Sequence, residues 1–188
     1  MIIRAPHLPG GVVSSRLVES LDLYPTVAAL AGLPPPPDLD GTDLTPLFID
    51  PNSEVKPSVA FSEYPRCAPP QTPWDDRSSC GSTPREDFDV MGLSVRVPDW
   101  RYTAWMRWNG TLLLPDFSRP AAAVELYAHS GDDESNFDMY ENENVASNPA
   151  NAKVVSHLHA MAEAQWSRGR CRPHERPCLI DGKPTCCK

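Results

Sequence analysis

The sequence lacks the features that would place it at a membrane or on a nucleic acid. No run approaches the roughly 18 apolar residues that a membrane-spanning helix needs, so we expect no membrane partner. Basic residues are scarce: 17 Lys and Arg stand against 25 Asp and Glu, giving a net charge of −8. We therefore expect no nucleic-acid partner, which would need a basic face. The first residues carry no charged segment before an apolar run, so we expect no signal peptide there.

Proline and cysteine, by contrast, are abundant. The 22 prolines are too many for a helical bundle and predict loops and short strands. Six cysteines predict disulfides and an oxidising compartment, that is, the secretory pathway, the lysosome or the extracellular space. They comprise Cys67 and Cys80, which flank a polar loop, and Cys171, Cys178, Cys186 and Cys187, whose connectivity stays open. A glycosylation sequon at Asn109 agrees with that compartment. A secretory-type chain without a secretory signal leads us to expect that its true beginning is missing.

The cysteine-rich tail has an alternative interpretation as a zinc site. His174 lies between Cys171 and Cys178, and two further cysteines follow. Because this spacing does not match a zinc-finger pattern, disulfides are the preferred interpretation.

Hydrophobic periodicity predicts two helices around a small sheet. The first helix begins at Asp22 as N-cap and ends at Gly32, and the second spans residues 151–166 after Asn148 and Pro149. Period-2 alternation predicts a hairpin from residues 90–97 and 101–108. With strands near residues 58–66 and 122–128, this hairpin forms an antiparallel sheet that the second helix covers. Ile2 and Ile3 are expected to end a short buried strand.

Several separated motifs resemble the sulfatase family. They are Leu21–Thr26, Ala31–Leu33 and Gly41–Leu47, which resemble the run that closes the catalytic core, and Val124–Tyr127 with its acidic turn, which resembles the last strand. Residues 62–66, 91–96 and 99–105 are similar to the iduronate-2-sulfatase group. The resemblance implies an incomplete α/β fold of the alkaline-phosphatase-like sulfatase type. In it, residues 1–50 end the catalytic core, residues 51–166 form a C-terminal subdomain of antiparallel sheet plus helix, and residues 167–188 are a Cys-rich tail.

The resemblance also implies a chemistry that most of this chain does not carry. Sulfatases cleave sulfate esters with a formylglycine made from the cysteine of a C-x-P-x-R motif, and a calcium ion neutralises the sulfate. Those catalytic and metal-binding residues are expected in a missing N-terminal half. We therefore predict that the isolated chain is inactive, and that the full enzyme acts on a sulfated carbohydrate, either a glycosaminoglycan or an algal-type polysaccharide.

Two short segments copy parts of that machinery out of context. Residues 67–71 match the first four positions of the formylglycine motif but carry Gln71 in place of its arginine, after the core-closing motifs. A loop cysteine paired with Cys80 is the preferred interpretation. Asp75 and Asp76 resemble a metal-binding pair, but one pair in a polar loop cannot supply the 6–8 oxygens that calcium prefers. No catalytic or metal ligand is therefore assigned in this chain.

The resemblance implies a substrate-binding role for Tyr64 and Arg66, on a segment that reaches back over the catalytic pocket. A guanidinium can hold a sulfate or carboxylate bidentately, and a tyrosine ring can pack on a sugar. A salt bridge for Arg66 is the equally weighted alternative. The aromatic residues of 100–108 could suggest a carbohydrate platform, but strand alternation favours dividing them between the core and the helix cover.

Two further functional hypotheses remain open. The chain is either a non-catalytic secreted module that binds glycan or protein, or a truncated gene product. In the second case Ile2, Ile3, Val27 and Leu30 would be exposed, because the core on which they pack would be missing.

Overall fold

The computed structural model describes residues 1–67, 80–133, 139–167, 176–180 and 183–187. The chain divides into two compact units, one of Met1–Ala60 with Arg96–Pro98, the other of Phe61–Val95 with Asp99–Lys188. The boundaries predicted at residues 50 and 166 stay predictions. Among the described residues, no helix has the length and apolar character that crossing a membrane requires.

The first unit holds the helix α1, Leu23–Leu30. It ends in a Schellman motif, in which the Leu33 amide donates to Ala28 O at 2.9 Å and Gly32 adopts φ 68°. Asp22 is the N-cap residue of this helix, as predicted, but its backbone is helical and its side chain makes no cap hydrogen bond to α1. The capping box lies one turn earlier, at Glu19, before the 3-10 turn Ser20–Asp22.

Asp22 instead joins three segments of the first unit. Its fully buried carboxylate accepts hydrogen bonds from the backbone amides of Glu19 and Thr42, each at 2.8 Å, and pairs with Lys56 Nζ at 2.9 Å. Burial acts to raise the pKa of Asp22, but these donors outweigh it, so the pKa lies below its ordinary value. Gly41 permits this approach, since a Cβ there would lie 2.0 Å from the Leu21 carbonyl oxygen.

Several apolar side chains of the first unit are exposed. Ile2 is 100% exposed, Val27 57% and Leu30 37%. No strand forms at Ile2 and Ile3, so the predicted buried strand is wrong: these residues have no partner strand to pair with among those described. The exposure along α1 leaves an apolar stripe, which we define as Leu23, Tyr24, Val27 and Leu30.

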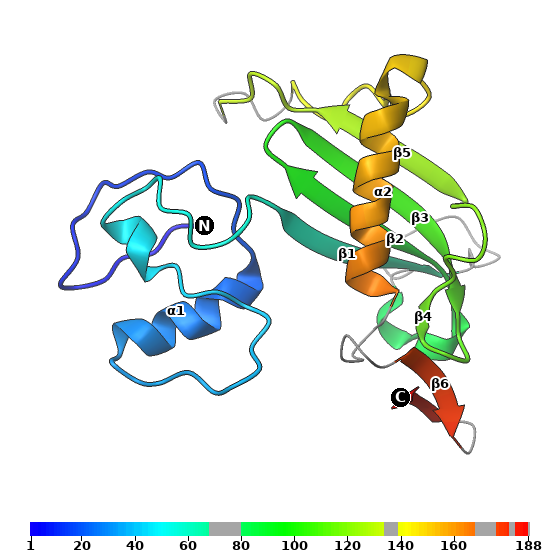
Figure 1. Cartoon of the computed structure of the whole chain (residues 1–188), viewed down its shortest axis with the longest axis horizontal. Coiled ribbons are helices and arrows are strands. Elements are labelled where there is room, and N and C mark those ends of the chain that lie inside the picture. Colours follow the sequence, from blue (N-terminus) through cyan, green and yellow to red (C-terminus); the bar gives the residue numbers. More distant parts are fainter. Residues whose placement is uncertain (68–79, 134–138, 168–175, 181–182, 188) are drawn as a thin grey trace. The chain divides into compact units, whose positions relative to one another are not determined.

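The second unit is built on an antiparallel sheet covered by one helix, as predicted (Figure 1). The strands are β1 Ala60–Cys67, β2 Phe88–Val97, β3 Trp100–Asn109, β4 Leu114–Pro115 and β5 Ala123–Ala128. Their order is β1-β2-β3-β4, and β5 pairs with β3 in a register that places Thr103 opposite Glu125. The predicted hairpin is thus β2 and β3.

The helix α2, Ala152–Trp166, lies across one face of this sheet (Figure 1). It follows a 3-10 turn, Pro149–Asn151, in which the Asn148 side chain accepts the Ala150 amide at 3.0 Å, as the capping signal predicts. The core between sheet and helix comprises Met91, Leu93, Val95, Tyr102, Ala104, Met106, Leu126, Leu158 and Ala162. Tyr102 reaches α2 through a 2.8 Å hydrogen bond to His159 Nδ1, and burial raises its pKa to about 12.

The outer edge of β5 is covered by the segment that follows it. The Asn144 side chain accepts the Leu126 amide at 3.0 Å and donates to Val124 O at 3.0 Å. Next to it, the Val145 amide donates to Leu126 O at 2.9 Å. Asn144 therefore presents its amide to β5 as a neighbouring strand would present a peptide group.

The predicted disulfides are present. Cys67 is bonded to Cys80, and Cys178 to Cys187, the latter joining the tail strands β6 Arg176–Ile180 and β7 Lys183–Cys187. Cys186 is also disulfide-bonded. Cys171, His174 and the sequence matches at residues 68–71 and 75–76 lie outside the described residues.

Candidate functional site

The sheet face turned away from α2 carries a row of polar and aromatic side chains. On β3, Tyr102 faces the helix, so Trp105 falls on the opposite face. On β5, Leu126 is buried in the core and its neighbours Glu125 and Tyr127 alternate outward. On β1, Phe61 packs edge-on against Trp166 of α2 at 5.6 Å, which places Tyr64 and Arg66 on the same far face as Trp105.

Arg66 is held by two aromatic rings on this face. Its guanidinium carbon lies 5.3 Å from the centroid of the Tyr64 ring and 5.4 Å from that of Trp105. Both distances are within the range of cation–π attraction. Among the described residues, no carboxylate or other acceptor bonds to Arg66, so the salt bridge considered as an alternative does not form there. The result is an oriented cation whose N–H donors bond to no acceptor in the part of the chain that the structure describes.

Trp105 reaches Arg66 by crossing the intervening strand β2. A Cβ at Gly92 would lie only 2.7 Å from Cζ3 of the indole, so no other residue would let the ring lie there without a shift. Trp105 Nε1 donates to Glu125 Oε1 at 2.7 Å, and the Tyr127 hydroxyl donates to Glu125 Oε2 at 3.1 Å. Burial, together with the Glu125 carboxylate, raises the pKa of Tyr127. We call Trp105, Glu125 and Tyr127 the support cluster.

This arrangement suits the binding of an anion. Within the described ranges, no three His, Cys, Asp or Glu side chains gather in a way that could hold a metal ion. Arg66 offers a planar fork of donors for an oxyanion, and the Tyr64 ring is 55% exposed beside it. The resemblance pointed to Tyr64 and Arg66, and the structure brings them together. Sequence reasoning missed the support cluster. The available signal was the alternation on β5, in which Glu125 and Tyr127 flank Leu126 and therefore share the opposite face of the sheet.

The acidic turn after β5 is tied to the sheet by a buried histidine. His129 Nδ1 lies 2.8 Å from Asp132 Oδ2, and its Nε2 lies 2.9 Å from Glu141 Oε1. Glu141 also bonds to Arg101 of β3, and the His129 ring stacks on Tyr140 with centroids 5.7 Å apart. These contacts hold the turn in place, which is a structural role.

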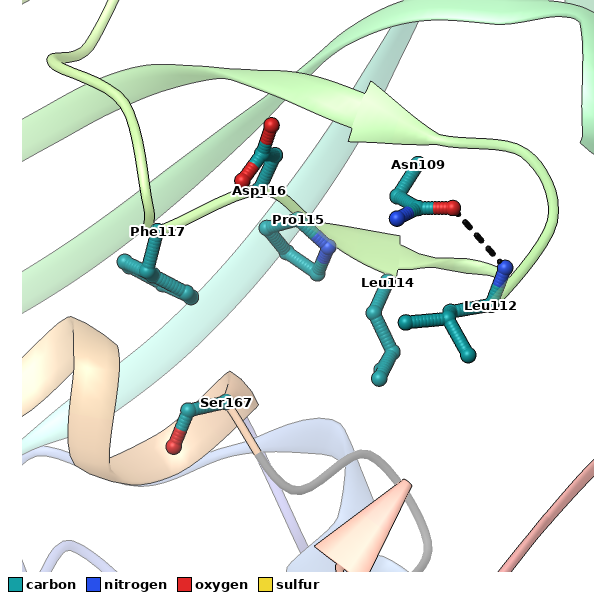
Figure 2. A pocket seen from close by; sticks show the side chains of 7 residues that line it. All are labelled: Asn109, Leu112, Leu114, Pro115, Asp116, Phe117 and Ser167. Carbon is teal, nitrogen blue, oxygen red and sulfur yellow. Dashed lines mark hydrogen bonds between the residues drawn. The ribbon is translucent and has the colours of Figure 1, made fainter. Parts of the chain in front are cut away.

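A separate cleft of about 240 Å³ lies where β3 turns into β4 (Figure 2). It is lined by Asn109, Leu112, Leu114, Pro115, Asp116, Phe117 and Ser167. Its one carboxylate, Asp116, is engaged by Ser118 and Arg119. The Asn109 side-chain oxygen accepts the Leu112 amide at 2.9 Å (Figure 2), which places the sequon in a turn. The glycosylation of Asn109 stays a prediction.

Two other aromatic residues of β3, Tyr102 and Trp108, are used in packing. Tyr102 is buried under α2, and Trp108 packs against Phe88 while its Nε1 donates to Arg85 O at 2.8 Å. Trp105 is thus the aromatic residue of β3 that contacts Arg66.

Comparison with known proteins agrees with the sulfatase resemblance. The chain is 34% identical over 151 residues to human iduronate 2-sulfatase, covering 69% of this chain and 26% of that protein. Arylsulfatase K of Danio rerio is 39% identical over 108 residues, which is 56% of this chain and 17% of the relative. No protein-family model matches the chain.

Among solved structures, the phosphonate monoester hydrolase SpPMH from Silicibacter pomeroyi matches with a TM-score of 0.58 at 23% identity. The match covers 86% of this chain and 27% of that one. It confirms the predicted fold class, part of an α/β fold of the alkaline-phosphatase-like type, to which the small antiparallel sheet with one long helix corresponds. The chain spans about a quarter of the length of the sulfatases that it matches first, 26% of human iduronate 2-sulfatase, and these sulfatases are its homologues.

Proposed function

We propose that the chain is the C-terminal portion of a sulfuric ester hydrolase of the iduronate-2-sulfatase type, acting on sulfated glycans. The observation that carries this proposal is the 34% identity to iduronate 2-sulfatase over 151 residues. The formylglycine and the calcium ligands would lie in the N-terminal half of such an enzyme. The described residues offer no ligand set for calcium.

In this proposal the chain supplies one wall of the substrate pocket through Tyr64 and Arg66. The guanidinium of Arg66 has no protein acceptor among the described residues, and its charge is held in place by the Tyr64 and Trp105 rings. A sulfate or carboxylate group of a glycosaminoglycan would supply the missing acceptor. The exposed Tyr64 ring would pack on the sugar itself.

The proposed location is the secretory pathway, with the lysosome or the extracellular space as destination. The disulfides Cys67–Cys80 and Cys178–Cys187 support it, since such bonds persist in oxidising compartments. Glycosylation at Asn109 belongs to the same proposal and would appear as a mass shift that a glycosidase removes.

The sulfatase proposal is tested by what lies upstream. Sequencing the 5′ end of the transcript should show an open frame that continues into a C-x-P-x-R motif and a paired aspartate. We also expect pure residues 1–188 to hydrolyse no sulfate ester, with or without calcium. A stop codon directly before Met1 in an abundant transcript, or calcium-dependent turnover by the isolated chain, would contradict the proposal.

A second candidate is a non-catalytic module that binds glycan. Arg66, which has no acceptor among the residues that the structure describes, lies next to the exposed Tyr64 and favours it, because this pair needs no catalytic half to bind an anion. Glycan binding by the chain alone, lost in Arg66→Ala and kept in Arg119→Ala, would support this function if the upstream frame is closed. Arg119 is a suitable control because it is 67% exposed and pairs with Asp116.

A further inference from the structure

We infer that Trp105, Glu125 and Tyr127, the support cluster, are positioning residues that set the Arg66 guanidinium for one oxyanion of an acidic sugar. The inference rests on the proposed substrate-binding role of Arg66 and names the residues on which that role depends. The Glu-Leu-Tyr motif of β5, which resembles the family's last strand, thereby gains a physical role for its two polar members.

The Arg66 side chain is held in place by packing. An arginine on a strand has several rotatable bonds, and fixing them without a protein acceptor requires packing. Tyr64 and Trp105 each face the guanidinium, at 5.3 Å and 5.4 Å from its central carbon. Tyr64 lies two residues away on the same strand, but Trp105 comes from β3, beyond β2. The orientation of the Trp105 ring therefore decides where the guanidinium rests.

The Trp105 ring is itself fixed by its contacts with Gly92 and Glu125. On one side, Gly92 leaves β2 without a side chain, so the indole lies directly on the strand. At its edge, the Nε1–H is anchored to Glu125 Oε1 at 2.7 Å. Tyr127 donates to the other oxygen of the same carboxylate at 3.1 Å, which prevents Glu125 from rotating away. The three side chains form a continuous chain of contacts from the edge of the sheet to Arg66.

The effect of Glu125 is also electrostatic. A donor that bonds to a carboxylate is polarised, and contacts of this kind strengthen one another in a partly buried setting. Donation from Nε1–H to an anion raises the electron density of the indole ring, and a richer ring attracts a cation more strongly. Glu125 thus acts on Arg66 through Trp105. The Glu125 carboxylate already accepts hydrogen bonds from Trp105 and Tyr127. It therefore does not bind the guanidinium directly, and the guanidinium can bind a ligand.

The geometry also indicates the ligand class. The rings of Tyr64 and Trp105 approach the guanidinium, and its N–H groups are the part left for a planar pair of acceptor oxygens. A sulfate or a sugar carboxylate has such oxygens. A neutral sugar lacks them, so neutral sugars should bind weakly even though the Tyr64 ring is exposed.

The test measures anion affinity in the full chain with two probes, inorganic sulfate and a sulfated uronate disaccharide, by calorimetry and by NMR of the indole N–H signals. Arg66→Ala should weaken both by about tenfold or more, and Arg66→Lys by several-fold, because a bidentate pair is lost. Glu125→Gln keeps an acceptor for Trp105 but removes the charge, and should weaken binding by about 3- to 10-fold. Glu163→Gln, on the exposed side of α2, is the control and should change nothing.

Structural damage is separated from positioning by two further readouts. The thermal midpoint of Glu125→Gln should stay that of the parent chain while its affinity falls. Both probes should shift the Trp105 Nε1–H signal in the parent, and Trp105→Phe should remove that signal along with much of the affinity. Where Trp105→Phe does not fold, Glu125→Gln and Tyr127→Phe carry the test.

The outcomes distinguish this inference from the function on which it rests. Arg66-dependent binding that is unchanged in Glu125→Gln and Tyr127→Phe would overturn the support cluster and leave the proposed function standing. The inference at Arg66 would be overturned if the parent chain and Arg66→Ala bound both probes equally well. It would also be overturned if neither protein bound a probe. An open frame that continues into the sulfatase motifs would then still uphold the proposed hydrolase.

Discussion

Replacing Asp22 by Asn should lower the stability of the first unit more than the same kind of substitution at any exposed carboxylate of that unit. The substitution keeps one acceptor oxygen and removes the other, so one of the backbone amides of Glu19 and Thr42 loses its partner. A buried polar group left unsatisfied costs about 1–3 kcal/mol. Lys56 keeps Glu19 at 2.6 Å, so it is not left as a lone buried charge. We expect a total loss of about 2–4 kcal/mol.

The Asp22 carboxylate should also make the free energy of unfolding depend on pH. Its folded pKa lies below the ordinary value of 3.8, so the folded state binds this proton less readily than the unfolded state does. The stabilisation is therefore complete above pH 3.8 and is lost as the pH falls through the lower folded pKa. Asp22→Asn should remove this part of the acid dependence and flatten the stability curve in that window.

Urea unfolding followed by circular dichroism, with amide exchange at Thr42, measures both effects. Asp50→Asn is the matched control, because Asp50 is exposed and its side chain only accepts the Asn52 amide; its cost should stay within about 0.5 kcal/mol. Two results would refute this expectation. One is an equal urea midpoint for Asp22→Asn and Asp50→Asn, and the other is an Asp22→Asn variant that loses stability at low pH as the parent chain does.

Three further predictions concern other parts of the molecule. Tyr102→Phe removes the hydrogen bond to His159 and should cost about 1 kcal/mol in urea unfolding, and a larger loss would mean that packing is disturbed as well. Replacing Cys67 and Cys80 together by Ser opens a loop with a sequence separation of 13 and should cost about 3 kcal/mol; no change in the unfolding midpoint would contradict this. Val27→Lys should reduce self-association of the isolated chain in analytical ultracentrifugation, because it breaks the exposed stripe of α1, whereas the same sedimentation as the parent would count against that surface.

Local signals predicted the sheet and its covering helix well. The β2–β3 hairpin follows from period-2 alternation, and the start of α2 follows from Asn148 and Pro149, all within a few residues of sequence. The N-cap position of Asp22 was also predicted, but the partners of its side chain were not, because a carboxylate accepts the amides of its own helix and distant amides equally well. Its use by Thr42 depends on a chain reversal that no local pattern encodes.

The candidate site was predicted only in part, for a comparable reason. Tyr64 and Arg66 are close in sequence, and the resemblance pointed to both. Trp105 and Glu125 meet because of the register of β5 on β3, and Trp105 meets Arg66 because Gly92 leaves the strand between them bare. Such contacts require the strand order, which alternation along one strand does not provide.

Asn144 has a consequence for how the protein behaves at high concentration. A strand at the border of a sheet offers its unpaired peptide groups to any other extended chain, which is how many fibrils begin to grow. Along β5 the Val124 carbonyl and both peptide groups of Leu126 are already occupied by Asn144 and Val145. Another chain therefore finds fewer unpaired groups at the middle of this border, which disfavours fibril growth by strand addition there.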